Sequence, residues 1–136
     1  RYFSTVKTMP HSRMQEYVNV DFSQTMSIVG VIEEHGHEHI IAEARYIKNR
    51  QNLFAEVAFI VDEKYQRLGI ATYMYQTLIR LAEEEGLHGF TADVLSSNIE
   101  MMKVFSKGGN RTSANLENGL YEVTIYFKNL SGDLQH

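Results

Sequence analysis

A glycine-containing turn in the middle of the chain has residue types that can bind an anion. The turn, Gln66-Arg67-Leu68-Gly69-Ile70-Ala71, follows an apolar run and opens a strongly periodic segment. Where a strand leads through a turn into a helix, the first helical amides lack intrahelical partners and the helix dipole favours negative charge. Gly69 allows close approach of a ligand, and Ala71 is too small to obstruct it. The pattern indicates a transferase with a phosphate-bearing cofactor, and a plain strand–loop–helix connection is the alternative.

The turn differs from the two best-known nucleotide-binding motifs. It contains no Gly-Lys-Ser/Thr, so it is not a P-loop. It has one glycine and no matching acidic residue about 20 positions further on, so it is not a dinucleotide-binding fingerprint.

One carboxylate, Glu56, interrupts the apolar run that precedes the turn. Strand alternation places it on the same face as Phe54, Ala58 and Ile60. A carboxylate among apolar neighbours is costly unless it is paired or used, and desolvation makes it a stronger base. Glu56 is therefore a candidate general base that takes a proton from an amine. The alternative is a structural glutamate paired with a basic residue, such as Arg45, on the neighbouring strand.

The N-terminal half predicts one short helix and three strands. Met14, Tyr17 and Val18 recur at helical spacing and Ser12 can act as N-cap, which favours a helix over residues 12–20. Apolar or alternating runs predict an antiparallel meander of strands over residues 27–34, 39–47 and 53–61. In the middle strand one face is expected to hold Ile40, Ala42, Ala44 and Tyr46, and the other Glu43 and Arg45.

The C-terminal half predicts a βαβ unit, a second helix and a hairpin. An apolar stripe predicts a helix over 69–85 that ends at Gly86, and its residues are Ile70, Met74, Leu78, Leu81 and Ala82. A strand follows over 90–95, parallel to 53–61. Ser97-Asn98-Ile99-Glu100 has the pattern of a capping box for a helix that ends near Gly108-Gly109. A hairpin turns at Asn118-Gly119. The predicted fold class is α+β, with a mixed, mostly antiparallel sheet flanked by helices.

Composition limits the classes of function. The 136 residues carry a net charge of −4, which argues against a nucleic-acid partner. The absence of cysteine excludes disulfides, thiolate-bound zinc and a cysteine nucleophile. No apolar run reaches the roughly 20 residues of a membrane span and no signal peptide is visible, so we expect no membrane partner and a cytoplasmic location. We expect one domain over 1–136, which can be a piece of a longer chain because it begins with Arg1.

The segment His35-Gly36-His37-Glu38-His39 contains good metal ligands. Neighbouring side chains in a strand point to opposite faces, and the glycine indicates a hairpin turn. We therefore expect an exposed turn with no metal site, and contacts with a substrate are the alternative.

Taken together, residues 53–109 resemble the core of the GNAT superfamily of acyl-CoA-dependent N-acetyltransferases. The family signature Arg/Gln-x-x-Gly-x-Gly/Ala is matched by Gln66, Gly69 and Ala71, and Asn98 starts the helix of a second motif. The order of elements over 12–128 also fits the family fold, in which a splayed strand pair forms an acyl-CoA wedge. The segment Ala55-Glu56-Val57-Ala58 resembles the C-terminal catalytic domain of bacterial protein lysine acetyltransferases. So do three segments near the start of the chain, Arg1-Tyr2-Phe3, 19–22 and 26–29.

The resemblance implies transfer of an acetyl group from acetyl-CoA to a primary amine, most simply a protein lysine, by direct attack. Glu56 would be the base, and a backbone amide around Ile60 would hold the oxyanion. Amides from Leu68 to Thr72 would hold the pyrophosphate, and backbone groups near Ile60 and Val61 would pair with the pantetheine arm. Arg67 could touch a phosphate or face solvent. The implied cofactor-binding residues are Ile60, Val61, Gln66, Arg67, Leu68, Gly69, Ile70, Ala71, Thr72 and Asn98.

One residue departs from the family pattern, because Phe105 stands where many members have a tyrosine that protonates the leaving thiolate. Tyr73 and Tyr121 are possible substitutes, although packing is the simpler interpretation of each. A thiol has a pKa of roughly 8.5, so departure as thiolate is tolerable. Two other functions stay open: acetylation of a small amine, and non-catalytic sensing of acyl-CoA.

Overall fold

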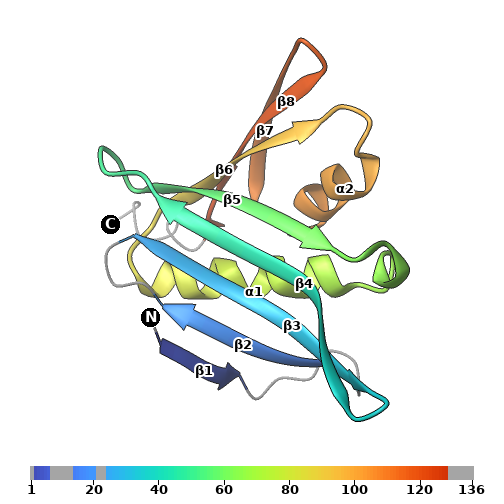
Figure 1. Ribbon diagram of the computed structural model, residues 1–136. Coiled ribbons are helices and arrows are strands. Elements are labelled where there is room, and N and C mark those ends of the chain that lie inside the picture. The colour runs from blue at the N-terminus through green and yellow to red at the C-terminus, as the bar shows by residue number, and fades with distance from the viewer. Residues whose placement is uncertain (1, 7–13, 21–23, 129–136) are drawn as a thin grey trace.

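The strands form one mixed sheet with the long helix α1 packed against one face (Figure 1). The computed structural model describes residues 2–6, 14–20 and 24–128. In this part of the chain the sheet has eight strands in the order β1-β2-β3-β4-β5-β6-β8-β7. The elements are β1 (Tyr2–Val6), β2 (Met14–Val20), β3 (Thr25–Glu34), β4 (His37–Lys48), β5 (Phe54–Val61), the 3-10 helix η1 (Glu63–Tyr65), α1 (Ile70–Glu84), β6 (Gly89–Leu95), α2 (Ile99–Lys107), β7 (Arg111–Glu117) and β8 (Leu120–Tyr126).

The predicted helix over 12–20 is wrong, because Met14–Val20 is the strand β2. It pairs antiparallel with β3, with Met14 opposite Ile32 and Val20 opposite Met26. Ser12, the expected N-cap, lies outside the described residues. A short apolar pattern fits either helix or strand, and pairing with the edge of a sheet is a tertiary interaction that local spacing does not reveal.

The antiparallel meander of β3, β4 and β5 is confirmed, but the expected alternation fails at one position in β4. The register shifts between Gly30 and Val31, whose partners are Ala42 and Ile40, so Ile41 is an extra residue in β4. As a result Ile41 is buried and Ile40 is 67% exposed, against the prediction. Such a bulge reverses the faces of the residues beyond it.

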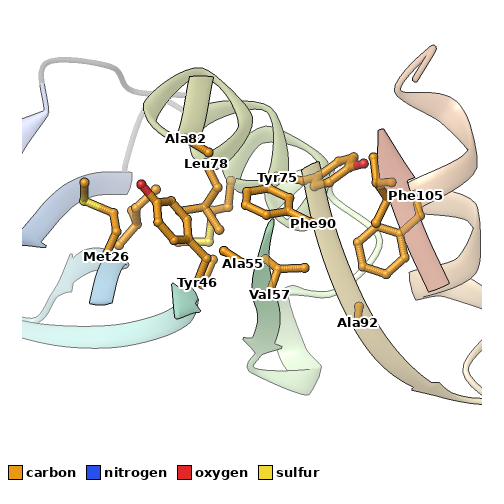
Figure 2. Close-up of a cluster of buried hydrophobic side chains, with 14 of the residues drawn as sticks. Met26, Tyr46, Ala55, Val57, Tyr75, Leu78, Ala82, Phe90, Ala92 and Phe105 are labelled. Carbon is orange, nitrogen blue, oxygen red and sulfur yellow. The ribbon is translucent and has the colours of Figure 1, made fainter. Parts of the chain in front are cut away.

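The core lies between α1 and the sheet. Figure 2 shows Ala55 and Val57 of β5 on the same side of the strand as Leu78 and Ala82 of α1, with Phe90 of β6 among them. On α1 the predicted stripe is confirmed at Ile70, Met74, Leu78 and Ala82, whereas Leu81 is only partly buried. Burial of these apolar side chains is the main term that holds α1 on the sheet.

The parallel pairing of β5 with β6 is confirmed, and it is short. Only the pairs Phe54/Gly89, Ala55/Phe90 and Glu56/Thr91 are formed between these two strands. The strands then separate, and in Figure 1 β6 turns away from β5 towards the loop that leads into α2. The two strands thus form a fork that is closed at the Phe54/Gly89 pair and open beyond Glu56/Thr91. The closed end requires glycine, since a Cβ at Gly89 would overlap the Ile125 carbonyl oxygen and lie 2.6 Å from the Phe54 ring. The result is a V-shaped opening between β5 and β6.

The second helix, α2, begins as predicted within the Ser97–Glu100 segment, but Asn98 caps it rather than Ser97. The Asn98 side chain accepts a hydrogen bond from the Met101 amide at 3.1 Å. α2 packs on α1 through Phe105, whose ring centroid lies 5.2 Å from that of Tyr75. The predicted hairpin is also confirmed, with Asn118 and Gly119 at φ 55° and 77°.

Candidate active site

The turn before α1 has the geometry of an anion site. Gly69 is the N-cap of α1 with φ 85°, and no side chain caps the helix. The first intrahelical hydrogen bond runs from the Tyr73 amide to the Gly69 carbonyl at 3.0 Å. The preceding amides, those of Ile70, Ala71 and Thr72, have no backbone acceptor in the described part of the chain. These free N–H groups and the positive end of the helix dipole can bind an anion.

A side chain holds this turn against the sheet. The Gln66 amide Nε2 donates to the Val61 carbonyl oxygen at 3.0 Å, across the 3-10 helix η1. Asp62 caps η1 by accepting from the Lys64 amide at 3.0 Å. Gln66 therefore fixes the distance between the end of β5 and the start of α1.

A cavity of about 530 Å³ lies at the open end of the fork. Its walls come from the end of β5, the turn before α1, the first turn of α1 and one face of α2. It brings together every residue predicted to bind the cofactor except Leu68, which does not line it and is 52% exposed. The residues that line it from the predicted set are Ile60, Val61, Gln66, Arg67, Gly69, Ile70, Ala71, Thr72 and Asn98.

The cavity also contains residues that the sequence analysis missed. Phe59 and Tyr65 border it, and α2 contributes one face made of Glu100, Met101, Lys103, Val104 and Lys107. The steps of three and four along α2 are the spacing of one helix face, which is the signal that could have found them.

Arg67 lines this cavity, is largely exposed to solvent and forms an ion pair with Glu100. Its Nε lies 3.4 Å from the Glu100 Oε2 at the start of α2, and the two side chains are 76% and 53% exposed. This position is compatible with both predicted alternatives for Arg67, a contact with a phosphate and a side chain that faces solvent.

Glu56 does not have the buried environment expected from its apolar neighbours. It is exposed on the sheet face opposite to Ala55 and Val57, the two residues that pack towards α1. There it borders a second cavity of about 400 Å³. The cavity is lined by Ile47, Lys48, Asn49, Asn52, Phe54, Glu56, Thr91 and Thr124.

The predicted alternative for Glu56, pairing with Arg45, is not formed. Arg45 lies opposite Ala58, and the register neighbours of Glu56 are Ile47 on β4 and Thr91 on β6. Thr91 is in turn opposite Thr124 on β8. Within residues 24–128 no ion pair involves the Glu56 carboxylate, which leaves it available to a molecule in the second cavity.

Phe105 is part of the core, and the two candidate general acids, Tyr73 and Tyr121, pack against it. Phe105 is buried between Tyr75 and Phe59, with ring centroids 5.2 and 6.0 Å from its own. Tyr73 and Tyr121 are partly buried and pack against the core, in agreement with the packing interpretation.

The histidine-rich segment forms the β3–β4 hairpin turn, with His35 and Gly36 at φ 54° and 79°. Its side chains are exposed. The described segments contain no group of three or more His, Cys, Asp or Glu side chains that could hold a metal ion. Among the same residues, no helix is both long and apolar enough to cross a membrane.

Comparison with known proteins identifies the family. Residues 2–109 match the profile of the family described as acetyltransferase (GNAT) family. The chain belongs to the GNAT acetyltransferase family. The resemblance to the GNAT superfamily is thereby confirmed. The α+β fold class predicted from the order of elements is confirmed by the mixed sheet and its helices.

The relatives include bacterial acetyltransferases named Pat. Over 110 residues the chain is 32% identical to acetyltransferase Pat of Mycolicibacterium smegmatis, covering 80% of this chain and 32% of that protein. The GNAT domain of S. lividans PAT is 26% identical and superposes with a TM-score of 0.65, covering 80% of this chain and 64% of that one. A cAMP-binding acyltransferase from Mycobacterium smegmatis has a TM-score of 0.71 at 20% identity, covering 93% and 48% respectively, and shares the fold.

Two of these acetyltransferases are longer than the chain. It spans 32% of the M. smegmatis acetyltransferase and 46% of acetyltransferase PA5475 from Pseudomonas aeruginosa, to which it is 23% identical.

Proposed function

We propose that this domain transfers an acetyl group from acetyl-CoA to the amine of a protein lysine by direct attack. One observation supports the proposal. The fork between β5 and β6 opens on a cavity that is also lined by the residues with free amides at the start of α1. This arrangement suits a ligand with a diphosphate at one end and an extended amide-containing arm.

The seat of acetyl-CoA follows from these features. The diphosphate would accept hydrogen bonds from the amides of Ile70, Ala71 and Thr72, with Arg67 nearby as a counter-charge. The pantetheine arm would enter the fork, where the separated edge of β5 around Ile60 and Val61 offers backbone groups. Asn98 would lie on the other side of the arm, at the start of α2.

The acceptor would approach through the second cavity, on the opposite face of the sheet. Phe54 and Ile47 provide apolar surface for the methylene stem of a lysine, and Glu56 provides a carboxylate for its nitrogen. A lysine ammonium has a pKa of roughly 10.4, so it must lose a proton before it can attack. Glu56 would accept this proton, directly or through a water molecule.

The reaction then balances without a covalent enzyme intermediate. The neutral amine nitrogen attacks the thioester carbonyl carbon, a C–N bond forms, and a backbone amide near Ile60 stabilises the oxyanion. The nitrogen of the tetrahedral intermediate gives up its second proton to solvent, and the C–S bond breaks as the carbonyl re-forms. CoA departs as thiolate, which takes a proton from solvent. Phe105 cannot supply that proton, and a thiol pKa of roughly 8.5 makes a dedicated acid unnecessary.

The choice of a protein lysine rests on the likeness to the bacterial Pat proteins and on the strand segment that contains Glu56. A small amine is the alternative acceptor, since the second cavity borders solvent on the exposed face of the sheet. A cytoplasmic location and a single domain over residues 1–136 stay predictions.

The proposal is tested by measuring acetyl-CoA binding by calorimetry and then CoA release with lysine-bearing proteins and with small amines. Tight binding with release that depends on a protein acceptor would support the proposal. Release with small amines alone would assign the alternative acceptor. Binding without release from any acceptor would favour an acyl-CoA sensor, and no binding would overturn the assignment of the anion site.

A further inference from the structure

Two lysines on α2 face the cavity of about 530 Å³ at the start of α1, which we call the cofactor cavity. Lys103 and Lys107 are four residues apart, which places their side chains on one face of the helix. Both are exposed and both line the cavity. Neither takes part in an ion pair within the described residues.

The charge of the cavity is opposite to that of the chain. The chain carries a net charge of −4, whereas the charged residues that line the cavity are Arg67, Lys103, Lys107 and one carboxylate, Glu100. Arg67 and Glu100 already pair with each other at 3.4 Å, so among the described residues the two lysines have no ion-pair partner. Like charges one helical turn apart disfavour each other, and an anion bound between them would relieve this repulsion.

These lysines belong to a different wall from the diphosphate site. The free amides of Ile70, Ala71 and Thr72 are on α1, whereas Lys103 and Lys107 are on α2. The cavity therefore offers two separate anion-binding positions, which suits a ligand with two separate phosphate groups.

We propose that Lys103 and Lys107 form a second phosphate subsite that binds the 3′-phosphate on the ribose of CoA. The inference rests on the proposed function, because it takes CoA as the ligand of the cavity. It adds a basis for selection: a molecule with the same pantetheine arm and diphosphate but no 3′-phosphate loses this contact. The domain therefore prefers CoA thioesters over dephosphorylated forms that carry the same acyl group.

The test is a comparison of CoA and dephospho-CoA binding by calorimetry, with the native chain and with the variants Lys103→Met and Lys107→Met. Methionine keeps an unbranched side chain and removes the charge. The native domain should bind CoA roughly five- to tenfold more tightly than dephospho-CoA, as expected for charge-assisted contacts at a partly exposed site. Each variant should lose most of this preference by weakening CoA binding, with dephospho-CoA binding nearly unchanged.

Lys64→Met is the matched control. Lys64 is exposed in η1 and does not line the cavity, so the substitution removes the same charge elsewhere. It should leave the ratio of the two affinities unchanged. Thermal unfolding of each variant checks that the fold is intact.

Two outcomes would overturn the subsite. Equal binding of CoA and dephospho-CoA by the native domain would show that no residue binds the 3′-phosphate. Equal weakening of both ligands in the lysine variants would assign the lysines to the diphosphate instead. In both cases CoA still binds, so the proposed function survives; failure of the native domain to bind either ligand would reject the proposed function itself.

Discussion

Glu56 and Thr91 are the last pair of residues joined across the parallel ladder of β5 and β6. Immediately beyond them the strands separate and the fork opens towards the cavity at α1. An acyl group bound in the fork would therefore lie next to the Glu56 carboxylate, on the face of the sheet that borders the second cavity. Its position, and not burial, makes Glu56 the candidate base.

Replacing Glu56 by glutamine should separate chemistry from binding. Glu56→Gln keeps the shape of the side chain and removes the proton acceptor, so turnover should fall about 100-fold or more, the usual contribution of a general base. Affinity for acetyl-CoA, measured by calorimetry, should stay within about twofold, because Glu56 does not line the cofactor cavity. Glu122→Gln is the control, since Glu122 is an exposed strand glutamate that borders neither cavity. Unchanged turnover in Glu56→Gln would remove the base assignment.

Two glycines at opposite ends of α1 allow the effect of backbone strain on stability to be distinguished from an effect on CoA binding. Gly69 and Gly86 have φ of 85° and 83°, and a Cβ at either would meet open space. Alanine at either position should cost about 1–2 kcal/mol of the free energy of unfolding, because each would hold a left-handed conformation. Only Gly69→Ala should also weaken CoA binding, by altering the free amides at the start of α1. Equal binding by the two variants would contradict the anion site.

Removing the one carboxylate in the cofactor cavity should strengthen binding of the cofactor. Glu100→Gln frees Arg67 from its ion pair and deletes a negative charge near the anion site, so affinity for CoA should rise roughly two- to fivefold. The gain should shrink at high salt. Glu117→Gln, an exposed glutamate on β7 outside the cavity, serves as control. A loss of affinity would mean that Glu100 contacts the ligand favourably.

Two buried tyrosines should respond in opposite ways to loss of the hydroxyl. The Tyr75 hydroxyl is buried and has no hydrogen-bond partner in the described part of the chain. The Tyr46 hydroxyl donates to Glu85, whose other oxygen pairs with Lys48 at 3.2 Å. Tyr75→Phe should therefore stabilise the fold by about 1 kcal/mol, whereas Tyr46→Phe should destabilise it by about 1–2 kcal/mol. Chemical denaturation measures both, and destabilisation by Tyr75→Phe would show that its hydroxyl has a partner.

The same two tyrosines predict loss of stability at alkaline pH. Burial raises the pKa of Tyr75 to about 12, and burial together with Glu85 also raises the pKa of Tyr46. Between about pH 10 and 12 the unfolded chain loses the Tyr75 proton while the folded chain keeps it. The free energy of unfolding should fall over this range, by at most about 1.4 kcal/mol per pH unit for this group. Tyr75→Phe should show a shallower decline.

Much of the fold could be predicted because several signals agree locally. The stripe on α1, the glycine at its end and the Asn118-Gly119 turn each favour one structure through neighbours in the sequence. The segment Met14–Val20 could not be assigned in this way, because its structure depends on the edge of β3. The bulge at Ile41 depends likewise on a neighbouring strand.

The part of the candidate site that consists of backbone groups was predicted best. The turn from Gln66 to Thr72 is a local feature, and the structure brings nearly all of it to one cavity. The surroundings of Glu56 were predicted wrongly, because strand alternation gives a face but does not tell which face a helix covers. The face of α2 was missed because its lysines become part of the site only when α2 packs beside α1.

The close contact at Gly89 has a consequence for how the enzyme could fail. Gly89 faces Phe54 at the closed end of the fork, and it borders neither cavity. Because any side chain there would push β6 away from β5 and β8, the spacing of the two strands at Glu56 is set by a residue that touches no substrate. Substitutions of Gly89 should therefore abolish the proposed acetyl transfer although every residue that lines the two cavities is retained.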